Sequence, residues 1–197
     1  RMLQAVRRSD VVVFLIDATR KISHVDRKLA QELQRQYKPT VLVLNKWDLV
    51  PEGTDPEEFG EYLTRELRGF DYAPIVLVSA ESAEGIEDVV SMAFNLREQA
   101  AHRETTGKLN AIIESILKQR GPSSRLGTQA KLLYVSQVAV DPPTIAMVVN
   151  DPKLFEGRYE RYLMNRLREE MPYSEVPIRL LFSKRTRKSL QDLKTRQ

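Results

Sequence analysis

The sequence predicts an α/β protein with a parallel sheet, followed by a small α+β domain. Apolar runs recur at Val11–Ile16, Val41–Leu44 and Pro74–Val78, and an amphipathic segment follows each of them. Strands that alternate with helices over short connections are typical of a parallel sheet. Beyond residue 101 the expected order becomes helix, strand, strand, helix, strand. The two orders of elements indicate two domains, residues 1–101 and residues 102–197.

Among these apolar runs, Val41–Leu44 is typical of an inner strand that is buried on both faces of a parallel sheet. The residues between them show helical spacing of their apolar side chains. Helices are expected at residues 1–8, at 27–36 with Asp26 as the cap, at about 57–68, and from Gly85-Ile86 onward.

The second and third expected strands both lead directly into short polar segments. Asn45-Lys46-Trp47-Asp48 follows the second strand, and Ser79-Ala80 follows the third. Ligands of open α/β sheets bind just beyond the carboxyl ends of the strands. The alternative is an ordinary turn, because Asn, Asp and Ser are common where a chain leaves a strand. The occurrence of both patterns, in order and on successive strands, favours a ligand site.

The pattern Asn45-Lys46-x-Asp48 matches the guanine-specificity motif of P-loop GTPases, and Ser79-Ala80 matches their second base-contact motif. The Asp48 carboxylate can accept hydrogen bonds from both N1–H and the 2-amino group of guanine. Adenine has an acceptor at N1 and no 2-amino group, so it offers neither of these donors. Lys46 can lay its aliphatic stem over the base while its ammonium stays in water. Asn45 can face the base or tie neighbouring loops together. The resemblance implies that the Ala80 N–H donates to guanine O6 and that Ser79 shapes the turn.

Residues 1–101 resemble, more specifically, the second half of the second GTPase domain of the EngA family, also called Der. The matching stretches are Ser-Asp-Val-Val-Val at 9–13, Ile-Asp-Ala at 16–18, Asn-Lys-Trp-Asp-Leu-Val at 45–50 and Val-Ser-Ala at 78–80. The family resemblance implies a GTPase that acts in ribosome assembly, with GTP or GDP as ligand.

No Gly-x-x-x-x-Gly-Lys-Ser/Thr pattern occurs in the 197 residues, so the chain has no P-loop to hold phosphates. The resemblance places that loop before Arg1, together with the groups that hold Mg²⁺. We therefore expect a fragment of a GTPase that binds only the guanine end of the nucleotide and is inactive alone. Its partners would include the missing N-terminal segments, since the strand Val11–Ile16 would otherwise be an unpaired apolar edge.

The second domain resembles the KH-like C-terminal domain of the same family. The matching stretches are Gln137, Pro-Pro-Thr at 142–144, Val-Asn-Asp-Pro at 149–152, Arg-Tyr-Leu at 161–163, Asn-Arg-Leu-Arg at 165–168 and Pro-Ile-Arg-Leu at 177–180. Helices are expected at 107–119, capped by Thr105-Thr106, and at about 153–170. Strands are expected at 131–140, 144–150 and 177–183. The Gly-x-x-Gly loop of ordinary KH domains, which clamps a nucleic-acid backbone, is absent from the sequence.

Charge is divided unevenly between the two domains. Residues 1–101 carry 13 Lys and Arg against 17 Asp and Glu, a net charge of −4, while residues 102–197 carry 18 against 10, a net charge of +8. A basic domain suits an anionic partner, and the resemblance implies rRNA of the large ribosomal subunit. The candidate nucleic-acid-binding residues are Arg158, Arg161, Arg168, Lys184 and Arg185. The alternative is that these residues form only a solvated helix face and tail.

Arg166 falls on the apolar face of the same helix, where it is expected to pair with a carboxylate or to dock the two domains.

Composition excludes several classes of protein. The chain has no cysteine, so disulfides and thiolate metal sites are impossible. No apolar stretch approaches the roughly 18 residues of a membrane helix. We expect a cytoplasmic protein with no membrane partner. Besides the GTPase, the sequence leaves open a nucleotide-independent RNA-binding or scaffold protein in which the GTPase fold has decayed.

Overall fold

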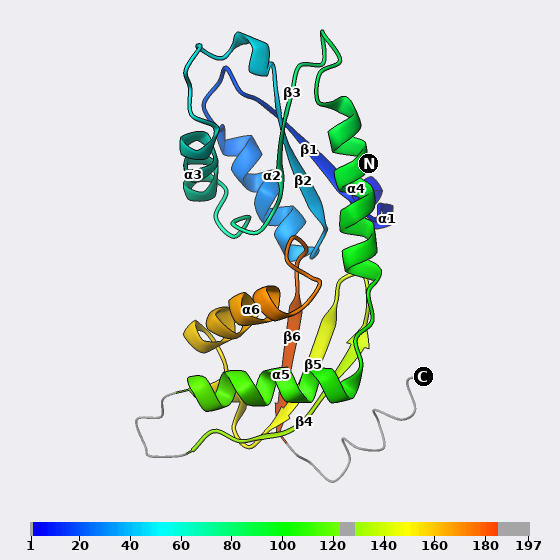
Figure 1. The fold of residues 1–197 in the computed structure, drawn as a ribbon, viewed down its shortest axis with the longest axis vertical. Helices are drawn as coiled ribbons and strands as arrows, with labels where there is room; N and C mark the ends of the chain where they lie inside the picture. The colour runs from blue at the N-terminus through cyan, green and yellow to red at the C-terminus, as the bar shows by residue number, and fades with distance from the viewer. Residues whose placement is uncertain (1, 123–128, 185–197) are drawn as a thin grey trace. The chain divides into compact units, whose positions relative to one another are not determined.

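The computed structural model describes residues 2–122 and 129–184, which fold into two compact units (Figure 1). Within the described residues, the first unit comprises residues 2–101 together with Tyr173–Pro177, and the second comprises residues 102–122, 129–172 and 178–184. Arg185 and the rest of the basic tail lie outside the described residues. Among the helices that the structure describes, none is long and apolar enough to cross a membrane.

A three-stranded parallel sheet forms the centre of the first unit. Its strands β1 (Val12–Asp17), β2 (Thr40–Asn45) and β3 (Ile75–Val78) are neighbours in that order. The side chains of Val41 to Leu44 are at most 1% exposed, as expected for a strand covered on both faces. Asp17 pairs in register with Asn45, and Asn45 with Val78, so the three carboxyl ends meet at one edge.

Helices cover both faces of this sheet. α2 (His24–Arg35) and α3 (Pro56–Glu66) pack on the face that carries Phe14, Leu42 and Leu44, and α4 (Ile86–Ala101) packs against the other face (Figure 1). The short α1 (Met2–Arg8) precedes β1. α2 begins three residues earlier than expected: Ser23 is its cap, and Asp26 lies inside the helix and completes a capping box with Ser23.

Strand β1 forms an edge of the described sheet and leaves apolar side chains in solvent. Val13 is 44% exposed and Leu15 is 59% exposed, although they pair in register with the buried Val41 and Val43 of β2. The expected unpaired apolar edge is therefore present in the structure.

The second unit has the expected order of helix, two strands, helix and strand. Its elements are α5 (Thr106–Gln119), β4 (Leu132–Ala139), β5 (Thr144–Val149), α6 (Arg158–Glu170) and β6 (Arg179–Lys184). β5 lies in the middle of the sheet, antiparallel to β4 and parallel to β6. Thr105 caps α5 as expected, and the apolar face of α5 is fully buried at Leu109 and Ile113.

The last helix starts later than the sequence pattern predicts. A short 3₁₀ turn, η2 (Pro152–Leu154), stands where the helix was expected to begin. Gly157 then adopts a positive φ of 70°, and α6 starts at Arg158. A residue with a positive φ cannot continue a right-handed helix, so Gly157 separates the two helical segments.

Candidate functional site

The two predicted base-contact patterns lie together at the carboxyl edge of the first sheet. Asn45 ends β2, and Ser79-Ala80 directly follows β3. A hydrogen bond joins them: the backbone N–H of Ala80 donates to Oδ1 of Asn45 over 3.1 Å. The structure thus gives Asn45 the loop-tying role, which was one of the two roles left open from sequence.

The chain turns sharply at the end of β2 and presents Asp48 to solvent. Lys46 has a φ of 63°, in the left-handed region that residues with a Cβ seldom adopt. A 3₁₀ turn, η1 (Trp47–Leu49), follows directly. The Asp48 carboxylate is exposed and has no hydrogen-bond or ion-pair partner within residues 2–122 and 129–184. It is therefore available to accept from a ligand.

Aromatic packing fixes this turn from behind. The Trp47 ring meets the Phe59 ring edge-on, with 5.6 Å between centroids, and Phe59 packs in the same way on Tyr62. The Tyr62 hydroxyl accepts from the backbone N–H of Ile22 over 2.9 Å. Contacts of this kind contribute about 0.5–1.5 kcal/mol each beyond their buried area. Trp47 therefore anchors the turn to α3, while its sequence neighbour Asp48 stays exposed.

Lys46 is held by a residue that the sequence interpretation did not assign to the site. Its ammonium lies 2.8 Å from Oδ2 of Asp17, at the carboxyl end of the neighbouring strand β1. The other carboxylate oxygen, Oδ1, accepts from the backbone N–H and the hydroxyl of Thr19, over 3.0 and 2.6 Å. The hydrogen bond from Lys46, followed by that from Thr19, lowers the pKa of Asp17 to about 2. The sequence feature that could have identified Asp17 as a site residue is its position, since it also stands at the end of a strand at this edge.

The loop after β3 is closed by its own hydrogen bonds. The Ser79 side chain is 3% exposed; its Oγ accepts from the N–H of Ser82 over 3.4 Å, and its N–H donates to the carbonyl of Glu84 over 3.1 Å. Gly85 ends the loop with a φ of 75°, and a Cβ there would lie 2.3 Å from the carbonyl oxygen of Leu77. Only glycine fits at this position. These bonds give Ser79 the turn-forming role that the resemblance implied.

The Ala80 N–H has an acceptor of its own in this structure. The family resemblance assigns this donor to guanine O6, whereas here it donates to Asn45. A base seated at this edge has to share the N–H with the Asn45 carbonyl or displace it. The two groups are exposed or half-buried, so a ligand can reach both.

The basic residues of the second unit fall into two groups. Arg158 and Arg161 are exposed on α6, and Lys184 is exposed at the end of β6. Arg168 is half-buried and already interacts with other groups, so it is not part of a free exposed stripe. Arg166 pairs with Glu169 and Glu170 on its own helix, which is the carboxylate pairing considered from sequence.

Comparisons with known proteins agree with this geometry. Residues 1–99 match the family described as the elongation factor Tu GTP binding domain. Residues 103–183 match the family described as the KH-domain-like C-terminal region of EngA bacterial GTPase enzymes. The first unit thus belongs to the GTP-binding class, and a KH-like unit follows it in the chain.

Named relatives narrow the class to one family. GTPase Der of Rhodopirellula baltica is 35% identical over 187 residues, which cover 95% of this chain and 41% of that protein. GTPase Der of Halothermothrix orenii is 34% identical over 187 residues (94% and 43%), and that of Rippkaea orientalis is 37% identical over 186 residues (92% and 41%). The chain belongs to the EngA/Der GTPase family. It spans about two fifths of the length of these relatives.

Proposed function

We propose that this chain supplies the guanine-binding half of a GTPase that acts in assembly of the large ribosomal subunit. Its second unit would dock the protein on rRNA, in the cytoplasm. The observation that supports the nucleotide part most strongly is the Asn45–Ala80 hydrogen bond. It joins two patterns that are 35 positions apart in sequence at the edge of a parallel sheet where ligands bind.

The chemistry of this edge suits guanine. The unpartnered Asp48 carboxylate can accept from the two adjacent donors of guanine, and adenine cannot supply them. Asp17 holds the Lys46 ammonium to one side, which keeps the lysine stem extended beside the base position. Sites that pair buried polar groups with a ligand reject analogues lacking those groups by as much as about 10⁴-fold.

These residues do not bind the phosphate end of the nucleotide. The 197 residues contain no P-loop, and the described ranges contain no cluster of three His, Asp or Glu side chains that could hold a metal ion. We therefore assign neither Mg²⁺ nor any step of hydrolysis to residues 2–122 and 129–184. Phosphoryl transfer depends on such elements, so the chain by itself is expected to be inactive.

A second candidate function is a nucleotide-independent RNA-binding or scaffold protein with a decayed GTPase fold. The exposed apolar side chains of β1 are compatible with it. The intact Asn45–Ala80 link and the unpartnered Asp48 favour the GTPase, because a decayed site has no reason to keep either.

Nucleotide selectivity tests the proposal that the first unit binds guanine nucleotides. In a polypeptide that joins this chain to a P-loop, GTP should compete for a fluorescent GDP analogue on the order of 10⁴-fold better than ATP. The measurement is displacement at equilibrium. Equal competition by the two nucleotides would favour the second candidate function, a nucleotide-independent RNA-binding or scaffold protein.

Cosedimentation with large ribosomal subunits tests the docking part. Changing Arg158→Glu and Arg161→Glu together should abolish association at moderate salt, because two exposed cations become anions beside phosphates. The matched control is Arg65→Glu with Arg68→Glu, which makes the same change of charge at two exposed arginines of the first unit. Docking through α6 is refuted if both double variants sediment like the wild type.

A further inference from the structure

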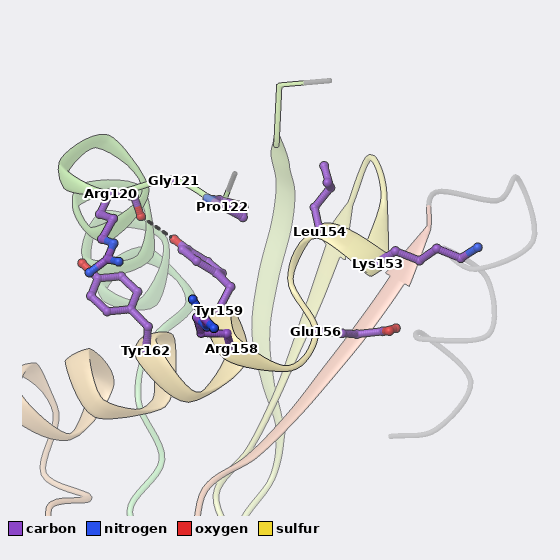
Figure 2. Close-up of a pocket in the computed structure, with 9 residues that line it drawn as sticks. All are labelled: Arg120, Gly121, Pro122, Lys153, Leu154, Glu156, Arg158, Tyr159 and Tyr162. Atoms are coloured by element: carbon purple, nitrogen blue, oxygen red, sulfur yellow. Dashed lines mark hydrogen bonds between the residues drawn. The ribbon is translucent and has the colours of Figure 1, made fainter. Parts of the chain in front are cut away.

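A cavity of about 500 Å³ lies in the second unit, between the end of α5 and the start of α6 (Figure 2). It falls within the roughly 300–1,000 Å³ typical of ligand pockets. Arg120 at the end of α5, Arg158, Tyr159 and Tyr162 of α6, and Lys153 and Glu156 of the segment before α6 contribute to its lining.

The aromatic wall of the cavity is built and braced within the unit. The Tyr159 hydroxyl donates to the backbone carbonyl of Arg120 over 2.8 Å, and the Arg120 guanidinium lies 5.1 Å from the centroid of the Tyr162 ring. The rings of Tyr159 and Tyr162 are 5.5 Å apart, and Tyr159 also packs edge-on against the fully buried Phe155. Burial raises the pKa of Tyr159 to about 12, so its hydroxyl stays protonated and keeps donating. Figure 2 shows Arg120, Tyr159 and Tyr162 gathered on one side.

Positive charge around the cavity is not neutralised inside the unit. Within the described residues, Lys153 and Arg158 have no carboxylate at ion-pair distance, whereas Lys108 and Arg166 of the same unit pair with glutamates. Glu156 is the one carboxylate among the lining residues. Its side chain and that of Lys153 both extend away from the tyrosines, whereas Arg158 lies beside them (Figure 2). The cavity therefore combines an excess of unpaired cations with an aromatic wall.

The first turn of α6 adds to this positive field. Gly157 precedes the helix and offers no side-chain cap, so the first backbone N–H groups lack the oxygen acceptor that a Ser or Asp cap would supply. A helix of 13 residues carries a partial positive charge at this end. The same end of α6 presents Arg158 and Tyr159 to the cavity.

We propose that this cavity binds one nucleotide of an unpaired RNA segment, with the base stacked on the Tyr159–Tyr162 wall and the adjoining phosphate held by Arg158. Stacking on aromatic side chains together with cationic contacts to the backbone is how proteins hold single strands. Bases inside a duplex are stacked on each other and cannot enter such a wall. This inference rests on the proposed docking on rRNA, and it adds that the contacted segment is single-stranded.

Binding of a short single-stranded oligoribonucleotide to the 197-residue chain, followed by fluorescence anisotropy, tests the proposal. Tyr162→Leu should weaken binding about fivefold or more, without changing the salt dependence, because it removes stacking and keeps the charge. Its matched control is Tyr134→Leu, which removes a 41% exposed tyrosine on β4 outside the cavity and should bind like the wild type.

Arg158→Ala tests the phosphate contact. The slope of log K against log salt should fall in magnitude by about 0.7, as expected for one phosphate contact on a single strand. Arg161→Ala, an exposed arginine one turn further along α6 that does not line the cavity, should keep the wild-type slope on this short RNA. Arg158 is itself exposed, so its loss leaves the packing of α6 intact and the test does not depend on Tyr162→Leu folding.

Three results would overturn the proposal: wild-type binding by both Tyr162→Leu and Arg158→Ala, equal competition by duplex RNA, or stronger competition by a phosphoserine peptide. If any of these results is obtained and the chain still sediments with large subunits, the cavity proposal is wrong and the proposed function stands. Conversely, the chain could bind RNA through the cavity and yet fail to sediment with ribosomal particles. Only the ribosomal role would then be contradicted.

Discussion

At the scale of single residues, the ion pair between Lys46 and Asp17 connects two strand ends. Its N–O distance is 2.8 Å, and Asp17 is held further by Thr19. The Lys46 side chain is long and 48% exposed, so the ion pair is what restricts the directions in which it can point. We infer that Asp17 positions the lysine stem beside the base while Asp48 makes the contact.

Asp17→Asn should therefore weaken guanine-nucleotide binding modestly. The pair is partly exposed, so the loss should be about two- to fivefold, in line with exposed ion pairs. GDP and GTP should lose affinity equally, since the contact lies at the guanine end. Because the pKa of Asp17 is about 2, the wild-type pair should persist down to about pH 3, and binding between pH 5 and 8 should not change through this group. Equilibrium titration of a polypeptide that joins this chain to a P-loop measures the affinity. An unchanged affinity in Asp17→Asn would contradict the positioning role of Asp17.

The residues of the site were partly predictable from the sequence. Asn45, Lys46, Asp48, Ser79 and Ala80 occur in local patterns, and the structure places all five at one sheet edge. Asp17 was not assigned, because its partner is 29 positions away and pairs only through strand register. Helix periodicity likewise placed Arg168 with the exposed arginines, but it cannot show which side chains are already engaged.

At the scale of elements, local sequence located every α-helix and strand that the structure describes, but not all of their ends and neither of the short 3₁₀ turns. The cap of α2 was assigned to Asp26 because an acidic residue is a good cap, whereas Ser23 and Asp26 act together as a capping box. The start of α6 was missed because Asp151-Pro152 is itself a strong start signal, and it begins a 3₁₀ turn instead. Gly157 separates that turn from α6 through its positive φ, which apolar periodicity does not reveal.

The start of α5 is held by a small polar network. Glu104 accepts from Nζ of Lys108 over 2.8 Å and from the N–H of Thr105 over 2.9 Å. The buried Gln137 of β4 accepts from the N–H of Glu104 over 2.7 Å and donates to the carbonyl of His102 over 2.8 Å. The Lys108 hydrogen bond, followed by that from Thr105, lowers the pKa of Glu104 to about 2.

Glu104→Gln should lower the free energy of unfolding of the second unit by about 1 kcal/mol at pH 7. A carboxyl whose pKa is lower in the folded chain stabilises the fold above its unfolded pKa, near 4.5, and loses that effect as pH falls toward 2. The difference from wild type should therefore shrink between pH 4.5 and 2. Urea unfolding at several pH values measures it, with the exposed Glu114→Gln as control. A difference that stays constant down to pH 2 would contradict this role.

At the scale of the whole molecule, the first unit exposes apolar surface that its own helices do not cover. Val13 and Leu15 of β1 are exposed on the sheet face whose β2 residues are buried, and Phe94 of α4 is 70% exposed. An uncovered edge strand of this kind promotes association with other chains. This edge was expected from the family resemblance; the apolar composition of the strand alone would instead indicate an inner strand.

Leu15→Lys should reduce self-association of the 197-residue chain, because a charge at an edge strand opposes pairing with another copy. Val25→Lys is the control, since Val25 is similarly exposed, at 63%, but lies on α2. Sedimentation equilibrium should give a lower average mass for Leu15→Lys alone. Identical masses for both variants and the wild type would show that the β1 face is not adhesive.

The nucleotide identity of the carboxyl edge is the central claim, and Asp48→Asn tests it most directly. In a polypeptide that joins this chain to a P-loop, the amide that replaces the carboxylate meets a donor of guanine with a donor of its own. The 2-oxo group of xanthine accepts from that amide instead. Equilibrium titration should show GDP affinity falling by at least about a hundredfold while xanthosine diphosphate gains affinity. Unchanged GDP affinity, with no gain for the xanthosine nucleotide, would contradict the assignment of this edge to guanine.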